Sequence, residues 1–225
     1  MVLLDGKKTA NDIKDEITIS VNEMIDLGEK VPRLAAVLVG SDGASLTNVG
    51  SKVRACERVG FNSTLIELPE TTSEEKLLKV IQDLNGNNDI DGFIVQLPLP
   101  KHIDEQKVLN AVNPAKDVDG FHPENFGRMA LEMESFIPAT PYGILQLLER
   151  YQVITKGKHT VVIGRSHIVG RPMSILMSQK GPAGNSTVTL THSHTKNLSE
   201  ITKQADIIIV ALGVPEFLKA SMVKD

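Results

Sequence analysis

The sequence predicts an α/β protein made of two domains, each built around a parallel sheet. Short, almost continuously apolar runs alternate with longer segments whose apolar residues recur at helical spacing. Strands that are apolar throughout are typical of parallel sheets, because helices cover both faces and neither face meets water. The alternation restarts near residue 138, after a stretch rich in turn-forming residues. We therefore expect a first domain over residues 1–139 and a second over residues 140–225.

Each domain is expected to contain three strands and the helices that connect them. In the first domain the expected strands cover residues 33–40, 63–69 and 91–100, and the expected helices cover 9–28, 45–60, 72–85 and 103–113. Residues 114–129 are expected to form a long loop. In the second domain the expected strands cover 159–164, 186–193 and 206–213, with helices starting at Thr140 and over 171–179 and 198–205. Residues 215–225 are expected to begin a helix that leads toward another strand. The second domain is therefore expected to be C-terminally incomplete, as in a fragment or a truncated gene product.

Composition excludes several classes of function. The 225 residues carry a net charge of −4, so no basic excess is available to neutralise nucleic-acid phosphates. The chain has no tryptophan and 4% aromatic residues, which disfavours stacking on single-stranded nucleic acid. No apolar run reaches transmembrane length, and the charged N-terminus does not resemble a signal peptide. We expect a cytoplasmic protein with no nucleic-acid or membrane partner.

The single cysteine, Cys56, excludes an internal disulfide and suits a reducing compartment. It belongs to an apolar stripe at helical spacing, so we interpret it as a small buried apolar residue and not as a nucleophile. The stripe consists of Leu46, Val49, Val53 and Cys56.

A second line at helical spacing lies beside this stripe and contains Ser45, Asn48 and Lys52. Alone, this line is better explained by the solvated flank of an amphipathic helix. Gln96 near the end of the third strand and Asp119 in the following loop bear on the choice. Each could be an ordinary strand-end or turn residue, but the carboxyl ends of parallel strands meet at one sheet edge. Together these side chains favour a ligand site in the first domain.

The second domain contains a candidate nucleotide-binding turn, "VVIGRSHIVGRP". A strand, a turn bounded by Gly164 and Gly170, and a helix follow one another, an order that can place a phosphate at a helix N-terminus. The spacing meets the G-x-G-x-x-G pattern only weakly, and a polar surface turn is the alternative. The next strand ends in "THSHTK", with hydroxyls and potential cations and no acid for ribose hydroxyls. Together with Arg165, this favours the 2′-phosphate of NADP over NAD.

The candidate cofactor-binding residues are Gly164, Arg165, Ser166, Gly170, Ser193, Ala211, Gly213 and Pro215. His192 and His194 are two residues apart and have no neighbouring acid, so we do not expect a metal site there.

Several motifs together resemble the bifunctional methylenetetrahydrofolate dehydrogenase/methenyltetrahydrofolate cyclohydrolase (FolD-type) family. They are "VGSDGAS", "DGFIVQLPLPKHI", "KDVDGFHPENFGRM", "PATPYGIL" and "VVIGRSHIVGRPM", and the resemblance runs along the whole chain. It implies a Rossmann-like NADP-binding second domain. The implied reactions are NADP-dependent oxidation of 5,10-methylenetetrahydrofolate and hydrolysis of the methenyl product to 10-formyltetrahydrofolate. It further implies a homodimer that binds tetrahydrofolate derivatives.

Carried over by position, the family's active-site lysine is Lys52, its glutamine partner is Gln96 and its pterin-binding aspartate is Asp119. The resemblance also implies substrate contacts from Ser45, Asn48, Leu97 and Pro98. Most family members have a tyrosine where this chain has Asn48, and we expect its loss to affect hydration more than hydride transfer.

Family chains continue for several tens of residues beyond the end of this sequence. The alternative hypothesis is therefore a weakly active or inactive remnant that binds folate or NADP. An unrelated NADP reductase would leave "VQLPLP" and "KDVDGF" unexplained.

Overall fold

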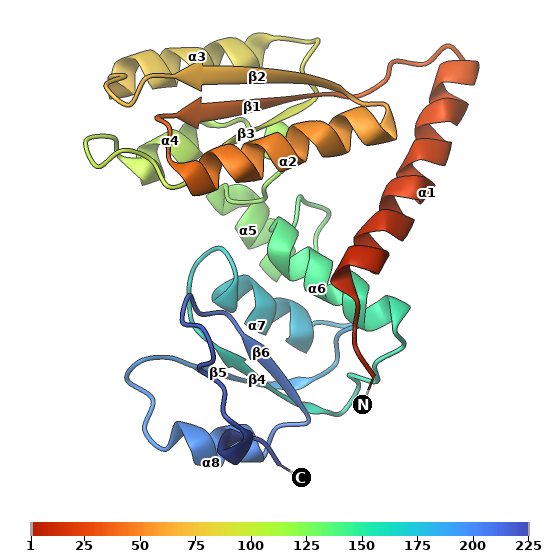
Figure 1. The fold of residues 1–225 in the computed structure, drawn as a ribbon, viewed down its shortest axis with the longest axis vertical. Coiled ribbons are helices and arrows are strands. Elements are labelled where there is room, and N and C mark those ends of the chain that lie inside the picture. Colours follow the sequence, from red (N-terminus) through yellow and green to blue (C-terminus); the bar gives the residue numbers. More distant parts are fainter. Residues whose placement is uncertain (1, 225) are drawn as a thin grey trace. The chain divides into compact units, whose positions relative to one another are not determined.

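The computed structural model describes residues 2–224, except for the side chain of Ala44. The chain divides into two compact units (Figure 1). One unit comprises Gly6–Asn125, and the other comprises the chain from Phe126 onward together with the residues before Gly6. Each unit has a parallel three-stranded sheet with helices, which confirms the predicted fold class. The division at residue 139 stays a prediction.

The first unit has the sheet order β2-β1-β3. Its strands are β1 (Arg33–Val39), β2 (Asn62–Leu68) and β3 (Gly92–Val95), and its helices are α1 (Gly6–Asp26), α2 (Gly43–Val59), α3 (Glu74–Gly86) and α4 (Glu105–Ala111). A short 3-10 helix, η1 (Pro114–Lys116), follows α4, and the boundary between the units falls within α5 (Pro123–Ala130). The central strand is the first along the chain, so the chain crosses over on both sides of β1.

Both faces of the first sheet are covered, as its apolar strands predict. Alternate residues of β1 such as Val37 pack with Leu77 and Ile81 of α3, while Leu38 packs on the opposite face with Val49 of α2. All five of these side chains are at most 2% exposed. Figure 1 shows α2 and α3 on the two sides of this sheet. This double burial fixes α2, the helix that carries Lys52, against the sheet.

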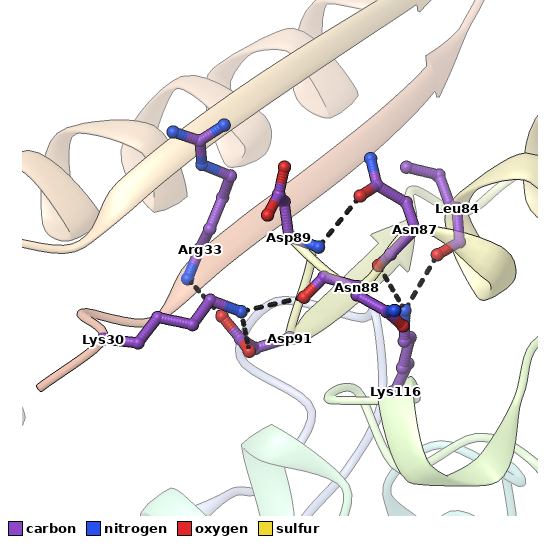
Figure 2. Close-up of polar contacts among 8 residues, drawn as sticks. All are labelled: Lys30, Arg33, Leu84, Asn87, Asn88, Asp89, Asp91 and Lys116. Atoms are coloured by element: carbon purple, nitrogen blue, oxygen red, sulfur yellow. Dashed lines mark hydrogen bonds and ion pairs between the residues drawn. The ribbon is translucent and has the colours of Figure 1, made fainter.

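Charged groups join the starting ends of β1 and β3 (Figure 2). The Asp91 carboxylate accepts hydrogen bonds from the Arg33 backbone N–H at 2.8 Å and from Lys30 Nζ at 2.6 Å. These two bonds lower the pKa of Asp91 below its usual value, and the bond from Lys30 has the larger effect. They hold the sheet at the end away from the carboxyl ends of its strands.

Two predictions for the first unit were wrong in extent. The third strand ends at Val95 and not at residue 100, although the Gln96 N–H still donates to the Val37 carbonyl at 2.9 Å. The Leu97–Pro98 peptide is cis, and a proline has no N–H to extend a ladder. The expected loop over 114–129 contains η1 and α5, and Pro123 is well suited to the first turn of α5.

The second unit repeats the arrangement, with the sheet order β5-β4-β6. Its strands are β4 (His159–Ile163), β5 (Thr187–Thr191) and β6 (Ile207–Val210), and its helices are α6 (Ala139–Arg150), α7 (Gly170–Ser178) and α8 (Leu198–Lys203). Val162 packs with Met173 and Met177 of α7, whereas Val161 packs on the other face with Ala205. The central strand β4 is again buried on both sides.

The ends of two expected helices differ. Helix α6 begins at Ala139, one residue before Thr140, with Pro138 at the cap position. The helix expected over 215–225 is absent from its described part, where η2 (Ala220–Met222) is the one helical turn. Glu216 has a φ of +53°, in the left-handed region that a right-handed helix cannot contain. In the described part of the chain, no helix is long and apolar enough to span a membrane.

Candidate active site

Helix α2 presents a lysine and an amide on its exposed side. Asn48 and Lys52 lie one turn apart and are both exposed, while Val49 is buried against the sheet. Ser45 is 3% exposed and Leu46 is 42% exposed, so the serine, and not the leucine, continues the buried stripe. The polar line is therefore reduced to Asn48 and Lys52, and the role of Ser45 as a substrate contact stays a prediction.

Lys52 meets an acidic partner from the loop after η1. Its Nζ atom lies 3.3 Å from Asp119 Oδ1, and the side chains are 44% and 14% exposed respectively. Charge-assisted hydrogen bonds are usually shorter, at about 2.7–2.9 Å. The lysine therefore keeps donors for a ligand, and the contact with Asp119 is easily exchanged for another.

Opposing effects act on the pKa of the Asp119 carboxyl group. Burial raises its pKa above the usual value, the Lys52 ammonium opposes that rise, and the neighbouring Asp117 carboxylate adds to it. A carboxylate in this setting gains strongly from a ligand that brings N–H donors, because such donors stabilise the charged form.

The pair lines a cavity between α2 and the sheet. The cavity has a volume of about 310 Å³ and is lined by residues of α2, of all three strands and of the loop at Val118 and Asp119. Its walls are mainly apolar, as in small-molecule sites, where a few polar groups fix orientation. Cys56 is also part of the lining.

Cys56 is buried and makes no disulfide, as predicted. Burial and the nearby Glu57 charge raise the pKa of its thiol above the usual value. A thiol that resists ionisation is a poor nucleophile, which agrees with a packing role.

Gln96 lies at the carboxyl end of β3. Its side chain forms no hydrogen bond with Lys52. Its Nε2 donates to the Leu97 carbonyl at 2.6 Å, and its Oε1 is buried with no hydrogen-bond partner among the described residues. A buried acceptor without a partner is costly unless a ligand, a water or another side chain satisfies it. Leu97 is half-buried and Pro98 is exposed, so both are available next to Gln96.

The turn after β4 depends on two glycines. Gly164 has a φ of +113°, and a Cβ there would lie 2.4 Å from the Ala211 carbonyl oxygen. A Cβ at Gly170 would lie 2.0 Å from the Gly164 carbonyl oxygen. The first turn of α7 thus packs directly on the end of β4, and this close approach fits the turn of a dinucleotide-binding sheet.

Side chains around this turn supply hydroxyls and cations. Ser166 Oγ accepts from the N–H groups of Val169 and Gly170, both at 3.2 Å, and so caps the start of α7. Arg165 is exposed and close enough to His192, at the end of β5, to act on it electrostatically.

The pKa of His192 lies below its usual value. Its partial desolvation is the main cause, and the charges of Arg165 and His194 add to it. The ring is therefore neutral at neutral pH.

The remaining predicted cofactor residues lie on the loops after β5 and β6. Ser193, Gly213 and Pro215 are exposed, and the Ala211 N–H donates to the Ile163 carbonyl at 2.8 Å. That bond holds the end of β6 beside the end of β4. In the described residues, no three His, Cys, Asp or Glu side chains gather in a way that could hold a metal ion.

Two family models match the chain in tandem. The catalytic domain of tetrahydrofolate dehydrogenase/cyclohydrolase matches residues 4–119, and the NAD(P)-binding domain of the same enzymes matches residues 138–225. The chain belongs to the tetrahydrofolate dehydrogenase/cyclohydrolase family. The predicted resemblance is thereby confirmed, and an unrelated reductase is excluded.

Relatives in this family match over the whole chain. A bifunctional protein FolD from Flavobacterium psychrophilum is 75% identical over 225 residues, which are 100% of this chain and 76% of the relative. A bifunctional protein FolD from Flavobacterium johnsoniae is 72% identical over the same shares.

Solved structures in the family share the fold. The bifunctional FolD enzyme of Campylobacter jejuni superposes with a TM-score of 0.95 at 43% identity, covering 100% of this chain and 78% of that one. The Trypanosoma brucei enzyme, complexed with NADP cofactor and inhibitor, gives a TM-score of 0.92 at 31% identity, covering 99% and 75%.

Two buried residues near Asp119 were not among the predicted site residues. Asp117 and Asn125 are 5% and 4% exposed and are hydrogen-bonded to each other. Both stand in the motif "KDVDGFHPEN", but Asp117 lies in a loop and Asn125 in the first turn of α5, so no single helical or strand period links them. The signal that could have found them is a carboxylate and an amide eight residues apart, on either side of a predicted site residue.

Proposed function

We propose that this chain catalyses two steps of one-carbon metabolism. NADP-dependent oxidation converts 5,10-methylenetetrahydrofolate to 5,10-methenyltetrahydrofolate, and hydrolysis then gives 10-formyltetrahydrofolate. The observation that carries the proposal is the Lys52–Asp119 pair, which lines an apolar cavity in a chain of this family. A remnant without activity is not favoured, because relatives named as bifunctional enzymes match all 225 residues.

Asp119 binds and orients the pterin ring. Its ionised carboxylate accepts two hydrogen bonds from the 2-amino group and the N3–H of the ring, in a parallel fork. These donors replace the 3.3 Å contact with Lys52 and offset the cost of burying the carboxylate. Folate binding should therefore weaken when Asp119 is protonated.

Lys52 serves the hydration step. The water oxygen bonds to the methenyl carbon and gives up both of its protons, the bond from that carbon to N5 breaks, and N5 takes up one of these two protons. The net result is one formyl group on N10 and one proton released. Lys52 Nζ moves the proton between water and N5. We assign to Gln96 Oε1, which has no hydrogen-bond partner among the described residues, the role of accepting from that ammonium or from the water.

The second unit holds NADP⁺, which when bound supplies the hydride acceptor. The turn from Gly164 to Gly170 receives the pyrophosphate, with Ser166 shaping the N-terminus of α7. Arg165 and Ser193 bind the 2′-phosphate, and His192 lies beside Arg165. Ala211, Gly213 and Pro215 line the remaining edge. The residues present fit this cofactor, because a side chain at either glycine would fill the turn.

We further propose that the protein is a cytoplasmic homodimer, as the family resemblance implies. Size-exclusion chromatography with light scattering tests the dimer. A single species at the mass of one chain would contradict it.

A coupled spectrophotometric assay of chain 1–225 tests the function. It supplies 5,10-methylenetetrahydrofolate and NADP⁺ and follows NADPH and the methenyl compound together. We expect NADPH formation, with the methenyl compound accumulating because Asn48 slows hydration. A folded sample that forms no NADPH would contradict the proposal.

A further inference from the structure

The loop that carries Asp119 is tied to the sheet immediately before it. Lys116 Nζ donates to the Leu84 carbonyl at 3.0 Å and to the Asn87 carbonyl at 2.7 Å, at the end of α3 (Figure 2). Asp117 forms an isolated parallel bridge with Phe93 of β3. The chain thus enters the loop from a fixed position.

The same loop is closed by a buried clasp, which consists of Asp117 and Asn125. Asp117 Oδ2 accepts from Asn125 Nδ2 at 3.0 Å and from the His122 N–H at 2.8 Å. Asn125 Nδ2 also donates to the Pro114 carbonyl at 2.9 Å, so one amide group from beyond Asp119 bonds two residues that precede it. The Gly120 N–H closes the turn on the Asp117 carbonyl at 3.1 Å. All of these residues belong to the first unit.

The carboxylate of Asp117 is stabilised by neutral donors alone. Among the described residues no Lys, Arg or His side chain forms an ion pair with it, although it is 5% exposed. Its charge therefore acts on the nearest titratable neighbour. The charged groups that act on Asp119 are Lys52 from α2 and Asp117 from its own loop. Asp117 thus places a second carboxyl group beside the Lys52–Asp119 pair.

We propose that Asp117 is a positioning residue, which holds Asp119 against Lys52 through the clasp and sets the pH range in which Asp119 binds folate. This inference rests on the proposed function of Asp119. Asp117 does not touch the ligand. It acts through the loop geometry and through its charge, which disfavours ionisation of Asp119.

Asp117→Asn tests the role of the charge. The substitution keeps the shape of the side chain and one acceptor oxygen. Binding of tetrahydrofolate to the full chain is measured by titration calorimetry as a function of pH. We expect Kd at neutral pH to rise roughly tenfold because the clasp loosens. We also expect the acid limb of the pH dependence to move to lower pH, because Asp119 loses a like-charged neighbour. A purely structural role would weaken binding without moving that limb.

Asn125→Ala tests the clasp separately. It removes both amide donors and leaves the Asp117 charge, so Kd should rise while the acid limb stays in place. Asp12→Asn is the control, because this carboxylate pairs with Lys8 on α1 and its loss changes the net charge equally. We expect the control to match the wild type. Each of the two clasp variants tests the positioning role once circular dichroism shows that the variant is folded.

The outcomes separate the two proposals. If the wild-type chain does not bind tetrahydrofolate, the proposed function and the positioning role both fail. If it binds and Asp117→Asn leaves the acid limb unmoved, or if folded Asn125→Ala binds like the wild type, the positioning role alone fails.

Discussion

Lys52 Nζ and Asp119 Oδ1 lie 3.3 Å apart although 67 residues separate them in the chain. One residue comes from the exposed side of α2 and the other from the loop beyond η1, and Val118 of that loop packs in the same apolar cluster as Val49 and Val53 of α2. The contact is long for an ion pair, and the lysine is 44% exposed. Each partner can therefore turn to a ligand at little cost, which suits a lysine that moves protons and a carboxylate that binds donors.

Lys52→Met should separate the two reactions. Loss of a proton-transfer group is expected to slow hydration roughly 10²–10⁴-fold. Hydride transfer should fall much less, because no proton moves in that step. The measurement follows methenyl absorbance and NADPH in the same sample. The control is Lys79→Met, which removes a lysine paired with Asp83 on the surface of α3 and should leave both rates unchanged. Equal loss of both activities in Lys52→Met would contradict the assignment.

Asn48→Tyr should restore contacts near the substrate. Asn48 is exposed one turn before Lys52, so an aromatic ring there can cover a ligand bound at the lysine. The ring is expected to contribute about 1–3 kcal/mol, and hydration should gain more than hydride transfer. Leu46→Tyr places the same ring at another exposed position of α2 and serves as the control. Equal changes in hydration and hydride transfer for Asn48→Tyr would contradict this hypothesis.

The central strands could be predicted from the sequence because they are apolar on both faces. The strand expected over 33–40 is found over 33–39, and its neighbours start within a residue of their predicted positions. The errors occur where backbone conformation overrides side-chain pattern. Proline ended β3 early, and the left-handed conformation of Glu216 prevented the last expected helix.

The site was predictable only where a residue stands on a regular element or in a specific motif. The prediction had Leu46 buried and Ser45 on the polar line, whereas the structure buries Ser45 and exposes Leu46. The sequence could not separate them because both fit a helical spacing to Val49, four residues and three residues away. The Asp117–Asn125 clasp was missed because a side-chain bond between a loop and the start of a helix leaves no period in the sequence.

Arg165→Ala should weaken NADP⁺ binding and leave NAD⁺ binding nearly unchanged. Removing a charged donor to the 2′-phosphate is expected to cost roughly 10–100-fold in affinity, equivalent to about 1.5–3 kcal/mol. Titration calorimetry with each dinucleotide measures the difference. Lys203→Ala on α8 is a control for loss of one positive charge. Equal weakening toward NADP⁺ and NAD⁺ would contradict a phosphate contact.

NADP⁺ affinity should also depend on pH. His192 has a pKa below its usual value, so it is neutral at neutral pH and gains a proton only as the pH falls. The added cation should strengthen NADP⁺ binding at lower pH and leave NAD⁺ binding level. Arg165→Ala removes one charge that lowers the pKa of His192. In this variant the rise in NADP⁺ affinity on acidification should therefore begin at higher pH. Parallel pH profiles for the two dinucleotides would argue against this role of His192.

Gly170→Ala should destabilise the second unit. Its methyl group would meet the Gly164 carbonyl oxygen at 2.0 Å and the Arg165 nitrogen at 2.9 Å, and backbone atoms cannot move aside cheaply. We expect a loss of about 1–3 kcal/mol or more in the free energy of unfolding, measured by urea titration. Gly143→Ala in α6 has no atom within 4 Å of the new methyl and should stabilise by about 0.4–1 kcal/mol. Similar effects at both glycines would contradict the close-packing account.

The burial of Cys56 has a practical consequence for labelling chemistry. It is the one sulfhydryl of the chain, and its raised pKa leaves little thiolate to react with maleimides or iodoacetamides at neutral pH. A cysteine introduced at an exposed position in either unit would react first. Fluorescent or spin probes could then report on each unit separately, without first replacing the natural cysteine.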